Sequence, residues 1–258
     1  MRGHMETARK PRLDLAKAVL PKPLLNAIIH LFKQGIEGCM LVGGTALSGF
    51  YSGHRRSDDI DLFTRDPISF KATVLAVKSL TKIGVQFLEV GAETGQYFRV
   101  TCSLERHVFT IDAVLDENIF RVGAFHRFDN GVCVADLRTL LMTKAATLVS
   151  RASEKDLYDL MWLFGEFPHI QIKDLVSLGN QIDAGVSGES VLISLGGANL
   201  SAAACDFLLS KKQNRNDLFT EIQAFRKGLI QGFQRYLEDE PAPPLRELVR
   251  HIAKLRQK

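Results

Sequence analysis

Apolar positions along the chain first follow helical spacing and then strand alternation. Residues 13–36 place apolar side chains at helical spacing, and two prolines divide them, so we expect two short helices. The apolar run at residues 39–42 ends in a glycine pair, and helix-compatible residues 45–51 follow it. This order predicts a strand, a glycine turn and a helix. Residues 59–64 alternate polar and apolar side chains, which predicts a second strand.

The pattern then changes from β-rich to helical. Residues 67–81 predict an amphipathic helix that a proline opens, and Asp129-Asn130-Gly131 predicts a hairpin turn within residues 120–134. β-rich composition predicts three strands between these segments, at residues 85–90, 97–103 and 108–115. After Asp136 the pattern is helical almost to the end, with breaks expected near residues 168, 185–188, 196–197 and 241–244.

A mixed sheet followed by helices predicts an α+β fold, with a small mixed β-sheet core and a helical C-terminal lobe. We expect the core with its N-terminal helices at residues 1–135 and the helical lobe at residues 136–258. The chain contains 46% apolar and 24% charged residues, as expected of a globular protein. The longest apolar stretches are too short to cross a bilayer, and no signal peptide is recognisable, so we expect a cytoplasmic protein without a membrane partner.

Cysteine content and charge refine this picture. The four cysteines are widely separated and form no CxxC pair, so we expect reduced thiols in the core. Residues 211–258 carry 11 Lys and Arg against 6 Asp and Glu, a net charge of +5, whereas the preceding residues sum to −1. A basic segment attracts polyanions such as RNA. A solvated helix surface would give the same composition.

Asp59-Ile60-Asp61 is the first candidate for chemistry. Residues i and i+2 of a strand point to the same face, so both carboxylates can bind one divalent cation. Magnesium prefers oxygen ligands and takes one or two protein carboxylates, leaving positions for phosphates and water. A solvated strand face, or the DxD motif of a glycosyltransferase, would present the same pair.

Two further segments fit a phosphate-handling site. Gly43-Gly44-Thr45 lies at a predicted strand-to-helix turn, where main-chain N–H groups can approach a phosphate, although a plain turn with a helix cap has the same sequence. Asp112 lies among apolar residues on a predicted strand, where an unpaired charge is costly. With Asp59 and Asp61 nearby we favour Asp112 as a third metal ligand and catalytic residue, and the alternative is a partner of an arginine.

The chain resembles a known family over about residues 39–164. Leu41-Val42-Gly43-Gly44-Thr45-Ala46-Leu47 and the run from His54 to Phe63 are similar to the GGTAL and HRxSxDIDLF signatures of AbiEii/AbiGii-type nucleotidyltransferases. These proteins are toxins of type IV toxin–antitoxin and abortive-infection systems, within the polymerase-beta-like superfamily. Lys144, Arg151 and the run from Lys155 to Leu160 resemble a later motif of the same family. Gly44-Thr45 replaces the GS dipeptide of the wider superfamily.

The resemblance implies roles for individual residues. It implies that Asp59 and Asp61 bind Mg²⁺ and that Gly44 and Thr45, with Gly43, hold the nucleotide phosphates. Lys144 would contact the triphosphate as a point charge. Arg55 and Ser57 would brace the turn or touch phosphate. Asp156 would position or deprotonate the acceptor, although the segment around it also fits a packed helix with an exposed acidic edge.

Together these features predict a magnesium-dependent nucleotidyltransferase that moves an NMP from an NTP to an acceptor hydroxyl. The first choice of acceptor is RNA at the tRNA 3′ end, which the basic C-terminal segment suits. One alternative is transfer to a small hydroxylated molecule, as in aminoglycoside-modifying relatives. Another is a non-catalytic module that binds nucleotide or protein. The resemblance also implies a cognate antitoxin encoded nearby.

Overall fold

A computed structural model describes residues 9–209 and 214–255 of the chain. The chain divides into two compact units, residues 9–140 and the part that begins at Leu141. The division falls inside helix α6 (Leu137–Thr147), whereas the predicted boundary precedes this helix.

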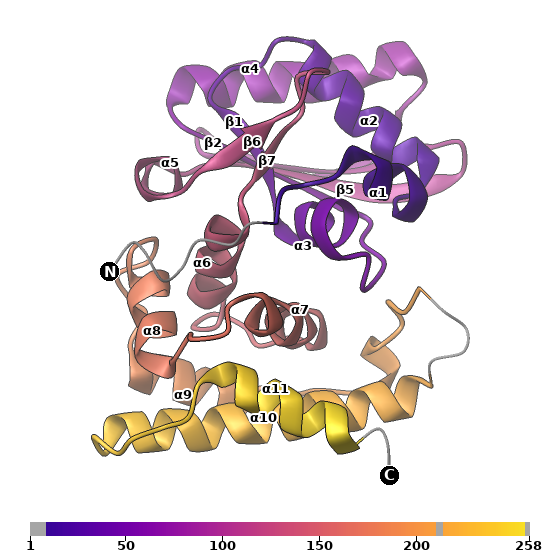
Figure 1. The fold of residues 1–258 in the computed structure, drawn as a ribbon. Coiled ribbons are helices and arrows are strands. Elements are labelled where there is room, and N and C mark those ends of the chain that lie inside the picture. Colours follow the sequence, from indigo (N-terminus) through magenta and orange to yellow (C-terminus); the bar gives the residue numbers. More distant parts are fainter. Residues whose placement is uncertain (1–8, 210–213, 256–258) are drawn as a thin grey trace. The chain divides into compact units, whose positions relative to one another are not determined.

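The first unit is built on a seven-stranded mixed sheet, which confirms the predicted fold class (Figure 1). In the sheet the strand order is β3-β4-β5-β2-β1-β7-β6. β2 pairs in parallel with β5 and antiparallel with β1, so it lies in the sheet interior. The strands are β1 (Cys39–Val42), β2 (Asp59–Thr64), β3 (Gln86–Glu93), β4 (Tyr97–Leu104), β5 (His107–Leu115), β6 (Phe125–Arg127) and β7 (Cys133–Ala135).

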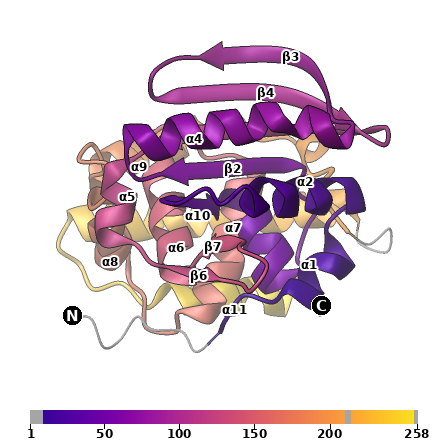
Figure 2. The same ribbon diagram turned by 90° about the horizontal axis from the view of Figure 1, so that it is seen from above.

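The two faces of the sheet differ in character. Ile60, Leu62 and Ile111 are fully buried on one face, where α4 (Pro67–Lys78) and α2 (Lys22–Lys33) pack against the strands (Figure 2). Apolar burial of this kind supplies most of the stabilisation of such a unit. The register pairs Asp61 with Asp112, so both belong to the opposite, polar face.

Short helical segments complete the first unit. They are α1 (Leu13–Val19), α3 (Gly43–Leu47), the π-helical turn η2 (Ser48–Ser52), the 3₁₀ turn η3 (Ser79–Ile83) and α5 (Glu117–Val122). The predicted hairpin is confirmed: β6 and β7 pair, and Gly131 at their turn has φ +90°. α5 was not predicted. It is a single short helix capped by Asp116, whose carboxylate accepts a bond from the Ile119 N–H.

The second unit is helical, as predicted. It contains α7 (Glu154–Glu166), α8 (Ile172–Asn180), α9 (Gly188–Gly197), the 3₁₀ turn η4 (Ala202–Ala204), α10 (Arg215–Leu237) and α11 (Leu245–Leu255). The predicted breaks near residues 168 and 241–244 fall between helices, and the one at residues 185–188 ends where α9 begins. The predicted break at residues 196–197 is displaced, because these glycines are the last two residues of α9. α10 contacts each of the other four helices of this list, and a Cβ at Gly228 would lie 2.3 Å from Leu248, so glycine permits the close packing of α11. Within the described residues no helix is long and apolar enough to cross a membrane.

Candidate active site

The polar face of β2 and β5 gathers three of the predicted carboxylates. The parallel register places Asp61 opposite Asp112 and Asp59 opposite Thr110, and residues paired in this way project to the same side of a sheet. The Thr110 hydroxyl donates to Asp59 Oδ1 at 2.5 Å, which fixes this carboxylate. Asp59 and Asp61 are both half-buried. The face is therefore a preorganised group of anionic oxygens.

The glycine turn lies directly against this face. Gly43 has φ +68°, and a Cβ at this position would lie 1.9 Å from Asp61 Oδ2. A Cβ at Gly44 would lie 2.2 Å from an Arg55 nitrogen and 3.0 Å from Ser57 Oγ. The turn thus needs glycine at both positions, for conformation at Gly43 and for close approach at both.

Thr45, Arg55 and Ser57 are buried around the turn. The Thr45 hydroxyl donates to the main-chain carbonyl of Asp59 at 2.5 Å, so it ties the start of α3 to β2. Arg55 Nη1 donates to the Arg56 carbonyl at 2.8 Å, and the Ser48 hydroxyl donates to the Arg55 carbonyl. Arg55 and Ser57 thus lie beside the turn at Gly44, and their roles in bracing it or in touching phosphate stay predictions.

Asp112 has both a hydroxyl and a cationic partner. The Tyr97 hydroxyl donates to Asp112 Oδ1 at 2.5 Å, and Arg99 Nη1 lies 3.2 Å from Oδ2. Burial, and then the bond to Asp112, raise the pKa of Tyr97. The hydrogen bond with Tyr97, and then the charges of Asp112 and Asp59, raise the pKa of Arg99. Asp112 therefore has an arginine partner, the alternative to a metal ion that the sequence allowed.

Sequence reasoning missed Tyr97 and Arg99. Both lie on β4, whose antiparallel register with β5 places Arg99 directly opposite Asp112. The sequence contained part of the information needed to find them. The predicted strands at residues 97–103 and 108–115 are joined by a short turn, which implies a hairpin. The register itself depends on which residues form that turn, and Glu105 and Arg106 both adopt positive φ there.

The predicted residues of the second unit form their own buried cluster. Lys144 Nζ lies 2.8 Å from Asp156 Oδ1 and 2.7 Å from Asp159 Oδ2, and its side chain is 8% exposed. Arg151 Nε lies 3.2 Å from Asp156 Oδ2, and the Ser153 hydroxyl bonds the same oxygen at 2.6 Å. Burial would raise the pKa of Asp156, but these cations and hydrogen bonds together lower it.

This cluster bears on two predicted roles. The Lys144 ammonium is already neutralised by two carboxylates, so a contact with a triphosphate would have to compete with both. The segment around Asp156 is a packed helix, but its acidic edge is buried and not exposed, because Lys144 pairs with both Asp156 and Asp159. The roles of Lys144 toward triphosphate and of Asp156 toward the acceptor stay predictions.

The donor set on the polar face suits a hard divalent cation. Asp59 and Asp61 supply two carboxylates from one face, the number that magnesium commonly takes from a protein. Within residues 9–209 and 214–255, no three side chains of His, Cys, Asp or Glu are grouped so as to hold a metal ion together. Asp59 and Asp61 fit Mg²⁺ as a pair, whereas Asp112 is held by Tyr97 and Arg99, and its role as a third metal ligand stays a prediction.

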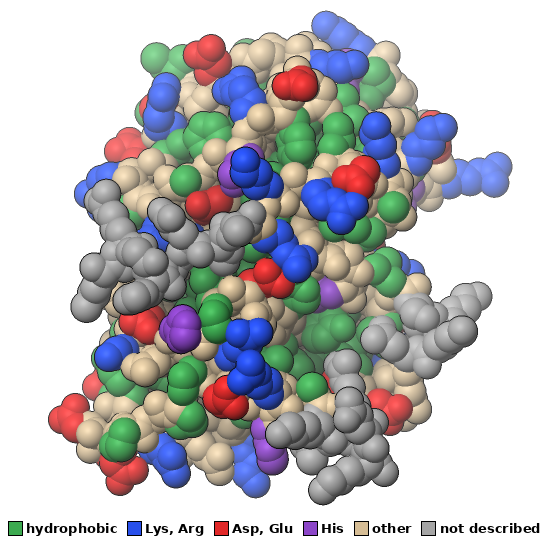
Figure 3. Space-filling view, in the orientation of Figure 1, with side chains coloured by type: hydrophobic (Ala, Val, Ile, Leu, Met, Phe, Trp, Pro, Cys, Tyr) green, Lys and Arg blue, Asp and Glu red, His purple; other side chains and the backbone are tan. Residues whose placement is uncertain are grey.

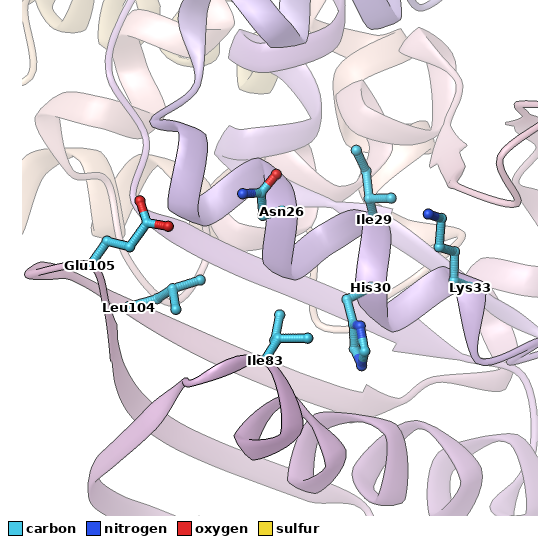
Figure 4. Close-up of a pocket in the computed structure, with 7 residues that line it drawn as sticks. All are labelled: Asn26, Ile29, His30, Lys33, Ile83, Leu104 and Glu105. Atoms are coloured by element: carbon cyan, nitrogen blue, oxygen red, sulfur yellow. The ribbon is translucent and has the colours of Figure 1, made fainter.

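A pocket of about 280 Å³ lies elsewhere in the first unit (Figure 4). Asn26, His30 and Lys33 on α2 and Leu104 and Glu105 at the end of β4 line it, together with Ile29 and Ile83. None of the predicted site residues is among them. The pocket is therefore separate from the carboxylate face.

Comparisons with solved structures identify the fold. MenT4, a nucleotidyltransferase toxin from Mycobacterium tuberculosis H37Rv, matches with a TM-score of 0.51 at 14% identity, over 93% of this chain and 90% of that chain. JHP933 from Helicobacter pylori matches with a TM-score of 0.49 at 17% identity, over 85% of this chain and 97% of that chain. The sequence matches no curated protein. The fold is that of a nucleotidyltransferase.

A known protein family matches most of this sequence. The family described as "Nucleotidyl transferase AbiEii toxin, Type IV TA system" matches residues 31–250, which is most of the chain. The chain therefore belongs to this family and is a nucleotidyltransferase. The match extends past the motifs recognised in the sequence and ends within α11. Membership implies an NTP substrate and a cognate antitoxin.

Proposed function

We propose that this enzyme uses Mg²⁺ to transfer an NMP from an NTP to an RNA hydroxyl, at the tRNA 3′ end. The observation that carries the proposal is the contact between the glycine turn and the carboxylate face, where Gly43 leaves no room for a side chain beside Asp61. A phosphate chain at this turn would lie next to Asp59 and Asp61. That juxtaposition is what phosphoryl transfer requires.

In the proposed reaction an acceptor hydroxyl attacks the α-phosphorus, and the bond to pyrophosphate breaks in line. Magnesium, when bound, would neutralise part of the negative charge of the phosphates. Asp59 and Asp61 would hold the cation, and Thr110 keeps the Asp59 carboxylate in place. Gly43 and Gly44 let the phosphates approach the main-chain N–H groups where α3 begins. Arg55, Ser57 and Thr45 keep the turn against β2.

The choice of RNA as the acceptor rests on the basic segment at residues 211–258. Lys211 and Lys212 lie outside the described residues, and Arg215 is 52% exposed with Asp206 at 3.4 Å. On the face drawn in Figure 3, Lys and Arg side chains are interspersed with Asp and Glu. We expect RNA binding to weaken steeply as salt is added, whereas transfer to a small molecule should be nearly indifferent to it.

Incubation with each radiolabelled NTP, magnesium and total RNA tests the proposal. Asp59→Asn should abolish label transfer, at least a hundredfold, because the cation loses a ligand that is fixed by Thr110. Asp58→Asn is the matched control: its side chain is 44% exposed beside His107, and the variant should retain activity. Thermal unfolding of both variants checks the fold.

The outcomes separate the candidate functions. Label in RNA that falls with added salt supports the proposal. Label in a small hydroxylated molecule would replace RNA as the acceptor while leaving the site assignment intact. Transfer by Asp59→Asn at the wild-type rate would refute the site, and NTP binding without release of pyrophosphate would identify a non-catalytic module.

A further inference from the structure

Asp112 is paired with a cation supplied by the chain itself. Arg99 Nη1 lies 3.2 Å from Oδ2 and 3.3 Å from Oδ1, so one nitrogen serves both oxygens. A bidentate guanidinium would use two nitrogens in parallel bonds, the arrangement that makes arginine–carboxylate pairs strong. The pair between Arg99 and Asp112 lacks this geometry and can exchange.

The position of Arg99 allows it to leave Asp112 without leaving the face. Its side chain is 46% exposed, whereas Asp112 is 13% exposed. Nearly half of the Arg99 side chain therefore faces solvent, toward which the guanidinium can turn.

Tyr97 bonds Asp112 directly as well as bonding Arg99. Its hydroxyl donates to Oδ1 at 2.5 Å, from the same strand as Arg99. Removal of the guanidinium would leave this bond in place. Asp112 would then keep its direction on the face that it shares with Asp61.

We propose that Arg99 competes with the divalent cation for Asp112 and, once displaced, binds substrate phosphate. The inference rests on the proposed function, because it takes Asp59 and Asp61 as the cation site. A guanidinium and a dication that approach the same carboxylate repel each other, so binding of one weakens the other. A guanidinium released beside the site would meet the phosphates, which it recognises through paired N–H groups.

Binding of Mn²⁺ to the full-length protein without nucleotide, followed by electron paramagnetic resonance, tests the competition. Arg99→Gln should bind Mn²⁺ about tenfold more tightly, since the Asp112 carboxylate no longer has to give up its guanidinium to reach the cation. Arg99→Lys keeps the charge and should stay near the wild-type affinity. Arg127→Gln is the matched control, because it removes an exposed arginine from β6 at the far edge of the same sheet. It should leave the affinity unchanged.

A second pair of variants tests the route through Asp112. In an Asp112→Asn background, Arg99→Gln should no longer tighten Mn²⁺ binding, because the two residues act on each other. In the presence of Mn²⁺, Arg99→Gln should weaken binding of labelled NTP about tenfold. A residue with only a structural role would not move metal and nucleotide affinity in opposite directions.

The results also separate this inference from the proposed function. If Asp59→Asn abolishes Mn²⁺ binding but Arg99→Gln binds Mn²⁺ no more tightly than wild type, the competition is wrong and the proposed site stands. If Arg99→Gln gains as much Mn²⁺ affinity in the Asp112→Asn background as in the wild type, the competition is also wrong. The gain would then come from the lost charge alone and not from the ion pair with Asp112. Wild-type protein that binds no Mn²⁺ through Asp59 overturns both.

Discussion

Gly43 combines two constraints that can be separated by experiment. Its φ of +68° disfavours any side chain, and a Cβ would also displace the Asp61 carboxylate. Gly35 has a similar φ of +72° with nothing within 4 Å of an added Cβ. The two glycines therefore share the conformational requirement but not the contact.

Gly43→Ala should lose both stability and transfer, whereas Gly35→Ala should lose stability only. The conformational cost is about 1–2 kcal/mol in each variant. Thermal unfolding measures that cost, and the labelled-NTP assay measures transfer. Equal activity of the two variants would show that the Asp61 contact has no part in the reaction.

For single residues, the sequence predicts position where this depends only on the repeat of a strand or on the order of neighbouring elements. Asp59 and Asp61 share a face because strands repeat every two residues, and Gly43 follows a strand directly. The partners of Asp112 and Lys144 could not be found in this way. They depend on the register of β4 with β5 and on the packing of α6 against α7, which no local pattern specifies.

At the scale of elements, helix α7 carries a buried charge cluster whose stability depends on pH. The pKa of Asp156 is lowered, so its ionised form is favoured in the folded chain. A group of this kind stabilises the fold above its ordinary pKa of 3.8, and the contribution is lost as the pH falls through the lower, folded value. Acid should therefore weaken this unit through Asp156.

Asp156→Asn should lower the free energy of unfolding at pH 7 by about 3 kcal/mol, because Lys144 and Arg151 lose a buried partner. The difference from wild type should shrink below pH 4. Denaturant unfolding across pH 3–7 measures it. Asp206→Asn removes an exposed carboxylate of the same unit and should follow wild type. A constant difference at all pH values would contradict the assigned ionisation.

Long periodic elements were predicted from the sequence, and short capped ones were not. The strands β1 and β2 have the predicted bounds, and the helical breaks near residues 168 and 241–244 fall where proline interrupts the pattern. α5 lacks a period long enough to recognise and depends on its cap at Asp116. The π-helical turn after α3 is a departure from regular helix that hydrophobic spacing does not encode.

At the scale of the whole molecule, the four cysteines report on the integrity of the fold. All are free and buried, as expected from their apolar neighbours. Burial raises the pKa of Cys39 and of Cys102 to about 12 and that of Cys205 to about 11. The thiolate is the reactive form, so these groups should be nearly inert in the folded chain.

A thiol reagent at pH 8 should modify the native protein more than about a hundredfold more slowly than the urea-unfolded protein. Release of the chromophore from an aromatic disulfide reagent measures both rates. The cysteines lie in both units, Cys39 in the sheet unit and Cys205 in the helical one, so each unit is reported separately. A fast phase without urea would mean that one unit opens by itself.

The interior position of β2 has a consequence for attempts to redesign this enzyme. Because β1 and β5 hold its backbone from both sides, the spacing of its two aspartates cannot be adjusted by small local changes. β3, by contrast, lies at the rim and exposes most of its length. Variants that alter substrate preference while preserving turnover should therefore be sought along the rim, with the central strand left as the fixed reference.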